Sequence, residues 1–147
     1  MKRILCVCLG NICRSPLAEG ILKAKAEALN APIEIASAGT AGYHIGSRAD
    51  KRSEAVGLKY NVDITNHKAQ KFQVEHFDAF DIILVMDQMN YENVSSLARN
   101  SFDIEKIKLY LLNEDVQDPY YGTPQDFENM YHILEGQAEH WIRTANQ

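Results

Sequence analysis

Cys8 and Arg14 frame a short stretch near the start of the chain, Cys8-Leu9-Gly10-Asn11-Ile12-Cys13-Arg14-Ser15. The apolar residues before it are typical of a buried strand. After it, Ser15 is a favourable helix N-cap and Pro16 suits the first helical position. The stretch is therefore predicted to join a strand to a helix. Such a loop points several backbone N–H groups at one spot on the positive end of the helix dipole, which favours an anion such as phosphate.

A thiol at the mouth of this loop can act as a nucleophile. Helix N-termini and neighbouring arginines favour the reactive thiolate, so Cys8 is the candidate. Arg14 carries a planar fork of donors that can bind two phosphoryl oxygens at once. A thiolate beneath a bound phosphoryl group predicts a phosphocysteine mechanism.

The alternative interpretation is that Cys8 is a small buried hydrophobe and that the Cys-x5-Arg spacing arose by chance. The local context favours the functional interpretation, since a strand precedes the motif and a helix start follows it. Gly10 and Asn11, inside the loop, also tolerate the left-handed backbone conformations that a tight anion loop requires.

The sequence around these residues resembles the low-molecular-weight protein tyrosine phosphatases. Val7 to Pro16 is similar to the signature of that family. The similarity continues, in the family's order, through Ser37-Ala38-Gly39-Thr40, Asn66-His67-Lys68-Ala69, Val85-Met86-Asp87 and Asp118-Pro119-Tyr120-Tyr121-Gly122. The chain is thus identified as a bacterial-type member. The resemblance implies a metal-independent protein-tyrosine-phosphatase that hydrolyses phosphotyrosine in proteins through a phosphocysteine intermediate.

Asp118 is the expected general acid and base. It follows the last predicted strand, so it shares with Cys8 the rim where the strands of a parallel sheet end. A tyrosine oxygen leaves poorly as an anion because the pKa of a phenol is near 10, and a carboxylic acid beside it removes that problem. By sequence alone Asp118 could equally begin an Asp-Pro turn; the resemblance implies the acid. Asp87 also follows a strand end, where helix capping is favoured over lining the rim.

The phosphate is expected to contact the loop backbone and Ser15. The residues assigned to this binding, besides Arg14, are Leu9, Gly10, Asn11, Ile12, Cys13 and Ser15. Ser15 is also a candidate donor to the Cys8 sulfur, a role that competes with helix capping. The resemblance implies that Asn11 holds the loop open with Ser37 and His67 as its partners.

Three tyrosines are candidates for the substrate pocket. The resemblance places Tyr43 at the mouth, beside Leu9 and Ile12. Tyr120 could wall the pocket and stack on a substrate ring. Tyr121 is either a pocket residue or part of the core.

Alternating strands and helices predict an α/β fold with three layers. Strands are expected at 3–7, 33–38, 80–86 and 107–112, and helices at 16–30, 50–60, 90–99 and from 124 onward. This alternation predicts right-handed βαβ units and a parallel sheet with helices on both faces. The resemblance implies four strands in the order 2-1-3-4.

The composition is that of a single globular domain over residues 1–147, with 46% apolar and 24% charged residues. A net charge of −5 argues against nucleic-acid binding and a membrane patch, and no apolar run reaches transmembrane length. A cytoplasmic protein is expected. Its partners would be tyrosine-phosphorylated proteins, with a bacterial tyrosine kinase as one candidate, and its oligomeric state is open.

The three cysteines, Cys6, Cys8 and Cys13, are clustered and do not form a secretory disulfide pattern. No metal and no cofactor are expected, because Arg14 and the loop amides supply the positive charge. Cys6 is expected in the core. Cys13 is either packed beneath the loop or able to form a disulfide with an oxidised Cys8, which would make the enzyme redox-sensitive.

Four other functions are compatible with a Cys-x5-Arg loop on such a fold. Arsenate reductases of the same superfamily need later redox cysteines, and none follows Cys13. Protein-arginine phosphatases resemble this family but carry Thr where Ile12 stands, so Ile12 favours tyrosine. A phosphocysteine carrier has no need of Arg14 and Asp118. A phosphoprotein-binding domain without turnover stays open on the sequence alone.

Overall fold

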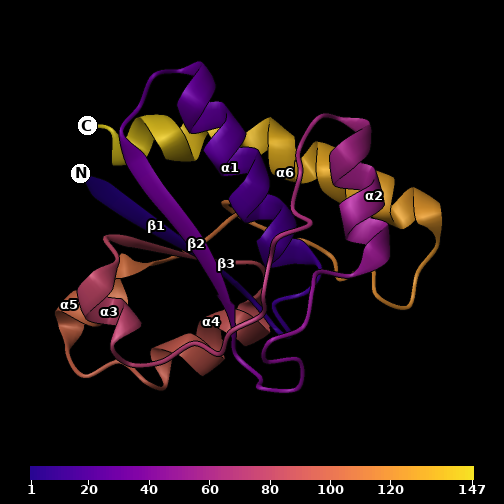
Figure 1. Cartoon of the computed structure of the whole chain (residues 1–147). Helices are drawn as coiled ribbons and strands as arrows, with labels where there is room; N and C mark the ends of the chain where they lie inside the picture. Colours follow the sequence, from indigo (N-terminus) through magenta and orange to yellow (C-terminus); the bar gives the residue numbers. More distant parts are fainter.

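The computed structural model describes residues 1–147 and has a central sheet with helices on both sides (Figure 1). Four parallel strands, β1 (Lys2–Cys8), β2 (Ile33–Gly39), β3 (Ile82–Val85) and β4 (Ile107–Leu109), are arranged in the order β2-β1-β3-β4. The helices are α1 (Arg14–Ala28), α2 (Lys51–Lys59), α3 (His76–Ala79), α4 (Gln88–Ser95), α5 (Ser101–Lys106) and α6 (Pro124–Ala145). The predicted fold class and strand order are confirmed.

Strand β1 divides its side chains between two cores. Successive residues of a strand point to opposite faces of the sheet. Ile4, Cys6 and Cys8 join the core beneath α1, α2 and α6, whereas Leu5 and Val7 join a smaller core on the other face. Both faces of the strand are therefore buried, as a central parallel strand requires. The expected core position of Cys6 is confirmed.

Helix α1 begins earlier than predicted. Its first residue is Arg14, its N-cap is Cys13, and no side chain caps it. The expectation that Ser15 caps the helix is therefore wrong. The hydroxyl of Ser15 contacts Cys8 and Asn11 instead, so it is not free to bind the helix N-terminus.

Helix α6 follows the prediction closely. Thr123 and Asp126 form a capping box, and Pro124 occupies the first turn. Its buried side chains include the predicted apolar stripe of Phe127, Met130, Tyr131, Leu134, Ala138, Trp141 and Ile142. The helix packs against α1 and α2.

The sequence did not predict α5, and β3 and β4 are shorter than expected. Helix α5 is held by local polar contacts, since Asn100 accepts from the Asp103 N–H and Arg99 pairs with Asp103. Such contacts leave no hydrophobic periodicity to detect.

No helix in the structure is long and apolar enough to span a membrane.

Replacing two helical glycines with alanine is expected to change the stability of the fold in opposite directions. A Cβ on Gly136 of α6 would meet no atom within 4 Å, whereas a Cβ on Gly57 of α2 would lie 2.6 Å from the Val62 carbonyl oxygen. Gly136→Ala should stabilise the fold by about 0.5–1 kcal/mol through helix propensity. Gly57→Ala should destabilise it by about 1–3 kcal/mol through overpacking. Urea unfolding of both variants measures this, and shifts of the same sign would contradict it.

Candidate active site

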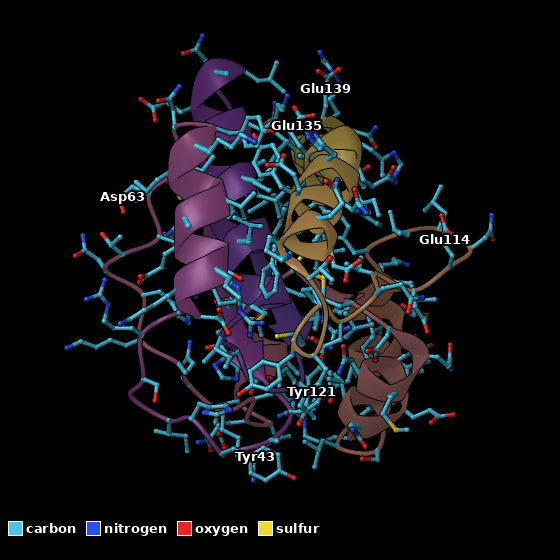
Figure 2. The ribbon with its side chains drawn as sticks, turned by 90° about the vertical axis from the view of Figure 1, so that its right-hand side faces the viewer. Tyr43, Asp63, Glu114, Tyr121, Glu135 and Glu139 are labelled. Carbon is cyan, nitrogen blue, oxygen red and sulfur yellow. The ribbon has the colours of Figure 1, made fainter.

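A cavity of about 330 Å³ lies beyond the carboxyl end of β1. Its walls come from the loop after β1, from the loop after β2 and from residues 118–121. The lining residues are Cys8, Leu9, Gly10, Ile12, Cys13, Arg14, Tyr43, His44, Asp118, Tyr120 and Tyr121. Figure 2 shows Tyr43 and Tyr121 at the same end of the molecule, opposite Glu135 and Glu139. The fold thus brings Cys8, Arg14 and Asp118 to one cavity.

The Cys8 side chain lies at the base of this cavity and is 3% exposed. Its Sγ is 3.0 Å from Oγ of Ser15, which is also buried. The Asn11 side-chain amide donates to the same Oγ at 2.8 Å. An oxygen that accepts from Asn11 keeps its own proton for the sulfur or for the Ala38 carbonyl, 3.4 Å away. A donor is therefore available to a negatively charged sulfur.

The loop conformation is organised around Asn11, which is fully buried and has a φ of 57°. Its amide nitrogen donates to Ser37 at 2.9 Å as well as to Ser15, and its Oδ1 accepts from the Gln70 N–H at 2.8 Å. His67 Nε2 donates to the backbone carbonyl of Asn11 at 2.7 Å. The contacts with Ser37 and His67 are thus present, and Gln70 is a partner that sequence reasoning missed.

Another missed contact lies behind Ser37, whose hydroxyl donates to Glu19 Oε1 at 2.6 Å. Glu19 is on α1, and its spacing from the motif offered no signal for this contact. The hydroxyl proton of Ser37 is committed to Glu19, so its oxygen accepts from Asn11 and fixes the direction of that hydrogen bond.

Arg14 is 2% exposed and is held from one side by two acceptors. Its Nη1 donates to Asp87 Oδ2 at 2.7 Å and to the Val116 carbonyl at 2.9 Å. Nη2 lies 3.5 Å from Asp118 Oδ2. Burial lowers the pKa of Arg14, but the negative charges of Cys8, Asp87 and Asp118 outweigh it and raise the pKa above its ordinary value. The guanidinium is a fixed, permanent cation at the cavity.

Asp87 is the main functional residue that sequence reasoning undervalued. It caps α4 as predicted, since Oδ1 accepts from the Asn90 N–H at 2.7 Å. Its other oxygen orients Arg14. The available signal was its position after β3, which places it on the same rim as Cys8.

Asp118 combines a turn with a place at the cavity. Oδ1 accepts from the Tyr120 N–H at 3.1 Å, as in an Asx turn, and the side chain is 40% exposed. Oδ2 faces Arg14. The turn does not exclude the acid role, because the two oxygens have different contacts.

The mouth of the cavity is aromatic and open. Tyr43, Tyr120 and Tyr121 all line it, and the rings of Tyr120 and Tyr121 meet edge to face at 4.9 Å between centroids. Tyr121 is 97% exposed, so the alternative that placed it in the core is wrong. His44 is a lining residue that sequence reasoning missed; its ring packs against Gly10.

Cys13 lines the cavity and lies under the N-terminus of α2. Ser53 donates to its carbonyl at 3.5 Å, and Asp50 donates through its backbone N–H to Ile12 O at 2.7 Å. Burial, with the Asp50 carboxylate, raises the pKa of the Cys13 thiol to about 12. Cys13 is a protonated thiol at neutral pH.

Comparisons with known proteins agree with this geometry. The profile of the family described as low molecular weight phosphotyrosine protein phosphatase matches residues 3–147. A low molecular weight protein-tyrosine-phosphatase of Streptomyces coelicolor is 36% identical over 143 residues, which cover 90% of this chain and 87% of the relative.

Two solved structures are similar over almost the whole chain. A protein tyrosine phosphatase from Entamoeba histolytica, with Hepes in its active site, has a TM-score of 0.92 and 32% identity and covers 98% of this chain and 96% of its own. Vibrio vulnificus Wzb in complex with benzylphosphonate has a TM-score of 0.87 and 30% identity and covers 97% of this chain and 98% of its own. The chain belongs to the low-molecular-weight phosphotyrosine protein phosphatase family.

Proposed function

We propose that this enzyme hydrolyses phosphotyrosine in proteins through a phosphocysteine intermediate on Cys8. The observation that carries the proposal is the meeting of the Cys8 thiol, the Arg14 guanidinium and the Asp118 carboxyl at one cavity. Membership of the phosphatase family supports the reaction class, and the geometry suggests the role of each residue.

In the first step the Cys8 thiolate attacks phosphorus, and the bond from phosphorus to the tyrosine oxygen breaks. Arg14 and the N–H groups of residues 9–15 bind the three remaining oxygens, where negative charge must be stabilised. Asp118 gives its proton to the leaving tyrosine oxygen. The products of this step are tyrosine and phosphocysteine.

In the second step water attacks phosphocysteine and Asp118 takes a proton from that water. The sulfur leaves as a thiolate, and the Ser15 hydroxyl donates to it, which makes its departure easier. Phosphate then leaves the cavity. The positive charge for both steps comes from Arg14 and the backbone amides, so the scheme needs no metal or cofactor.

The shape and lining of the cavity favour phosphotyrosine as the substrate. Cys8 is 3% exposed at its base, so a long side chain is needed to bring phosphorus to the sulfur. Tyr43, Tyr120 and Tyr121 supply aromatic faces for a phenyl ring. The Vibrio relative was solved with benzylphosphonate, which also joins an aromatic ring to a phosphorus group. Partners are tyrosine-phosphorylated proteins; a bacterial tyrosine kinase and a cytoplasmic location stay predictions.

A direct test compares phosphotyrosine, phosphoarginine and phosphoserine peptides side by side. The parent enzyme should cleave the phosphotyrosine peptide with a kcat/KM at least about a hundredfold above the others. Phosphoserine and phosphoarginine lack the aromatic ring that the cavity is proposed to contact, and the loss of specific contacts with a substrate lowers kcat/KM by about this factor or more. Cys8→Ser should lose turnover yet still bind vanadate, because the amides and Arg14 remain. Preferred cleavage of phosphoarginine would identify an arginine phosphatase, and vanadate binding without turnover by the parent would identify a phosphoprotein-binding domain.

Asp118→Asn tests the acid through its leaving group. Tyrosine needs a proton on departure, whereas nitrophenol, being far more acidic, needs it little. In the step that forms phosphocysteine, the variant should slow phosphotyrosine cleavage by about a hundredfold or more and nitrophenyl phosphate cleavage much less. Pre-steady-state phenol release measures this step without interference from hydrolysis. Equal losses for both substrates would mean that Asp118 only shapes the loop.

Cys13 is expected to protect Cys8 from irreversible oxidation. Peroxide oxidises the Cys8 thiolate to a sulfenic acid and is reduced to water; the Cys13 thiol then displaces water to form a disulfide. The raised pKa of Cys13 means that disulfide formation should accelerate as pH rises, because the attacking thiolate becomes more abundant. Activity regained with added thiol after peroxide measures this protection. Recovery by Cys13→Ala as complete as that of the parent would contradict it.

A further inference from the structure

The loop that carries Asp118 has few contacts with the rest of the protein. The hydrogen bonds of residues 117–122 run within the loop, from the Tyr120 N–H to Asp118 Oδ1 and from the Gly122 N–H to the Pro119 carbonyl. Pro119 is buried, but every other residue of the loop is exposed. Asp118 itself reaches Arg14 only at 3.5 Å. A catalytic acid must be held within hydrogen-bond reach of its target, so something else has to fix this loop.

Arg52, on the first turn of α2, lies against this loop. Its guanidinium is 5.5 Å from the centre of the Tyr120 ring and 4.5 Å from the centre of the Phe127 ring. Tyr120 belongs to the loop, and Phe127 is a buried residue of α6, the helix that follows it. Arg52 therefore joins the loop to the helix that the loop leads into.

The nitrogen-bearing edge of the same guanidinium is hydrogen-bonded to a carboxylate. Nε donates to Asp50 Oδ1 at 3.0 Å and Nη2 donates to Asp50 Oδ2 at 2.9 Å. These hydrogen bonds hold the pKa of Asp50 below its ordinary value, so the pair persists through neutral pH and weakens only in acid as the carboxylate is protonated. Asp50 in turn donates its backbone N–H to the Ile12 carbonyl of the phosphate-binding loop.

A continuous set of contacts therefore runs from the phosphate-binding loop to the acid loop, through Asp50, Arg52 and Tyr120. We propose that Arg52 is a positioning residue that holds the Asp118 loop against α2 and keeps the carboxyl in place for proton transfer. The role rests on the proposed function of Asp118. Only a planar guanidinium can bind a carboxylate with its edge and contact an aromatic ring with its face at the same time; a lysine ammonium cannot.

Substitution of Arg52 should impair proton donation and spare phosphate binding. Arg52→Gln should lower kcat/KM for phenyl phosphate by about tenfold, part of what general acid catalysis contributes, and leave nitrophenyl phosphate within about twofold. The inhibition constant of inorganic phosphate should not change, since Arg14 and the loop amides are intact. Arg52→Lys should show the same pattern. Lys51→Gln, which removes one positive charge from the neighbouring exposed residue, is the matched control and should behave as the parent.

A double variant separates positioning of the acid from a general loss of structure. In an Asp118→Asn background the acid is already absent, so adding Arg52→Gln should cause no further loss with phenyl phosphate. Amide hydrogen exchange gives a readout that does not depend on activity: residues 117–122 should exchange faster in Arg52→Gln than in the parent or in Lys51→Gln, with the sheet unchanged.

Three results would overturn the role of Arg52: equal losses for phenyl and nitrophenyl phosphate, a further loss in the Asp118→Asn background, or unchanged exchange at 117–122. A failure of the proposed function looks different, because the parent would then turn over neither phosphate ester, or Asp118→Asn would lose no more with phenyl phosphate than with nitrophenyl phosphate. Hydrogen exchange still reports on the loop in that case.

Discussion

The conformation of the candidate active site depends on one residue, Asn11, which is held in a left-handed conformation inside the loop that follows β1. Its backbone has a φ of 57°, which asparagine tolerates better than most residues but which still needs support. Hydrogen bonds to Ser15, Ser37, Gln70 and His67 supply that support, and all of them are made away from solvent or at its edge. These contacts give hydrogen-bond partners to the side chain and the backbone carbonyl of Asn11. The backbone N–H groups of the loop are therefore not needed as donors to Asn11.

Close packing behind the loop leaves it little room to relax. Gly39, at the end of β2, lies against the loop backbone, and a Cβ there would come within 2.8 Å of the Leu9 carbonyl oxygen. The Thr40 and Ala41 N–H groups donate to the Cys8 and Leu9 carbonyls at 2.9 Å. The chain after β2 thus supports the backbone of the loop that carries Cys8.

The charges of the site are balanced around Arg14. A buried guanidinium is costly unless anions pair with it, and Asp87 makes the closest pair. Asp118 is farther away, at 3.5 Å, and its side chain is more exposed, so its carboxyl is held less tightly by Arg14. In the proposed mechanism one acid orients the cation and the other transfers the proton, a division that fits their different distances to the same guanidinium. Hydrogen-bonding to Asp87 and the Val116 carbonyl also limits how Arg14 can turn, so a phosphate bound as proposed would meet a preformed donor.

The sequence predicted the parts of this site that local pattern determines. The strand, loop and helix around Cys8 follow from composition and spacing, and the parallel sheet places Asp118 on the same rim. Contacts between distant segments could not be read in the same way: the pairing of Asp87 with Arg14 and of Gln70 with Asn11 depends on how strands and loops meet in space. Two roles were open for Ser15: its type fits a helix cap, but tertiary contacts with Cys8 and Asn11 decide where its hydroxyl points, and the expected contact with the Cys8 sulfur is the one present.

The most direct measurement of the central claim is the location of the phosphoryl group during turnover. The enzyme would be mixed rapidly with phosphotyrosine peptide, quenched while turnover continues, digested and analysed by mass spectrometry under conditions that preserve thiophosphate bonds. The account predicts a phosphoryl group on the peptide that contains Cys8, formed as fast as tyrosine is released and lost as phosphate appears. Phosphate on another residue, or its release with no phosphoenzyme formed at any time, would contradict the account.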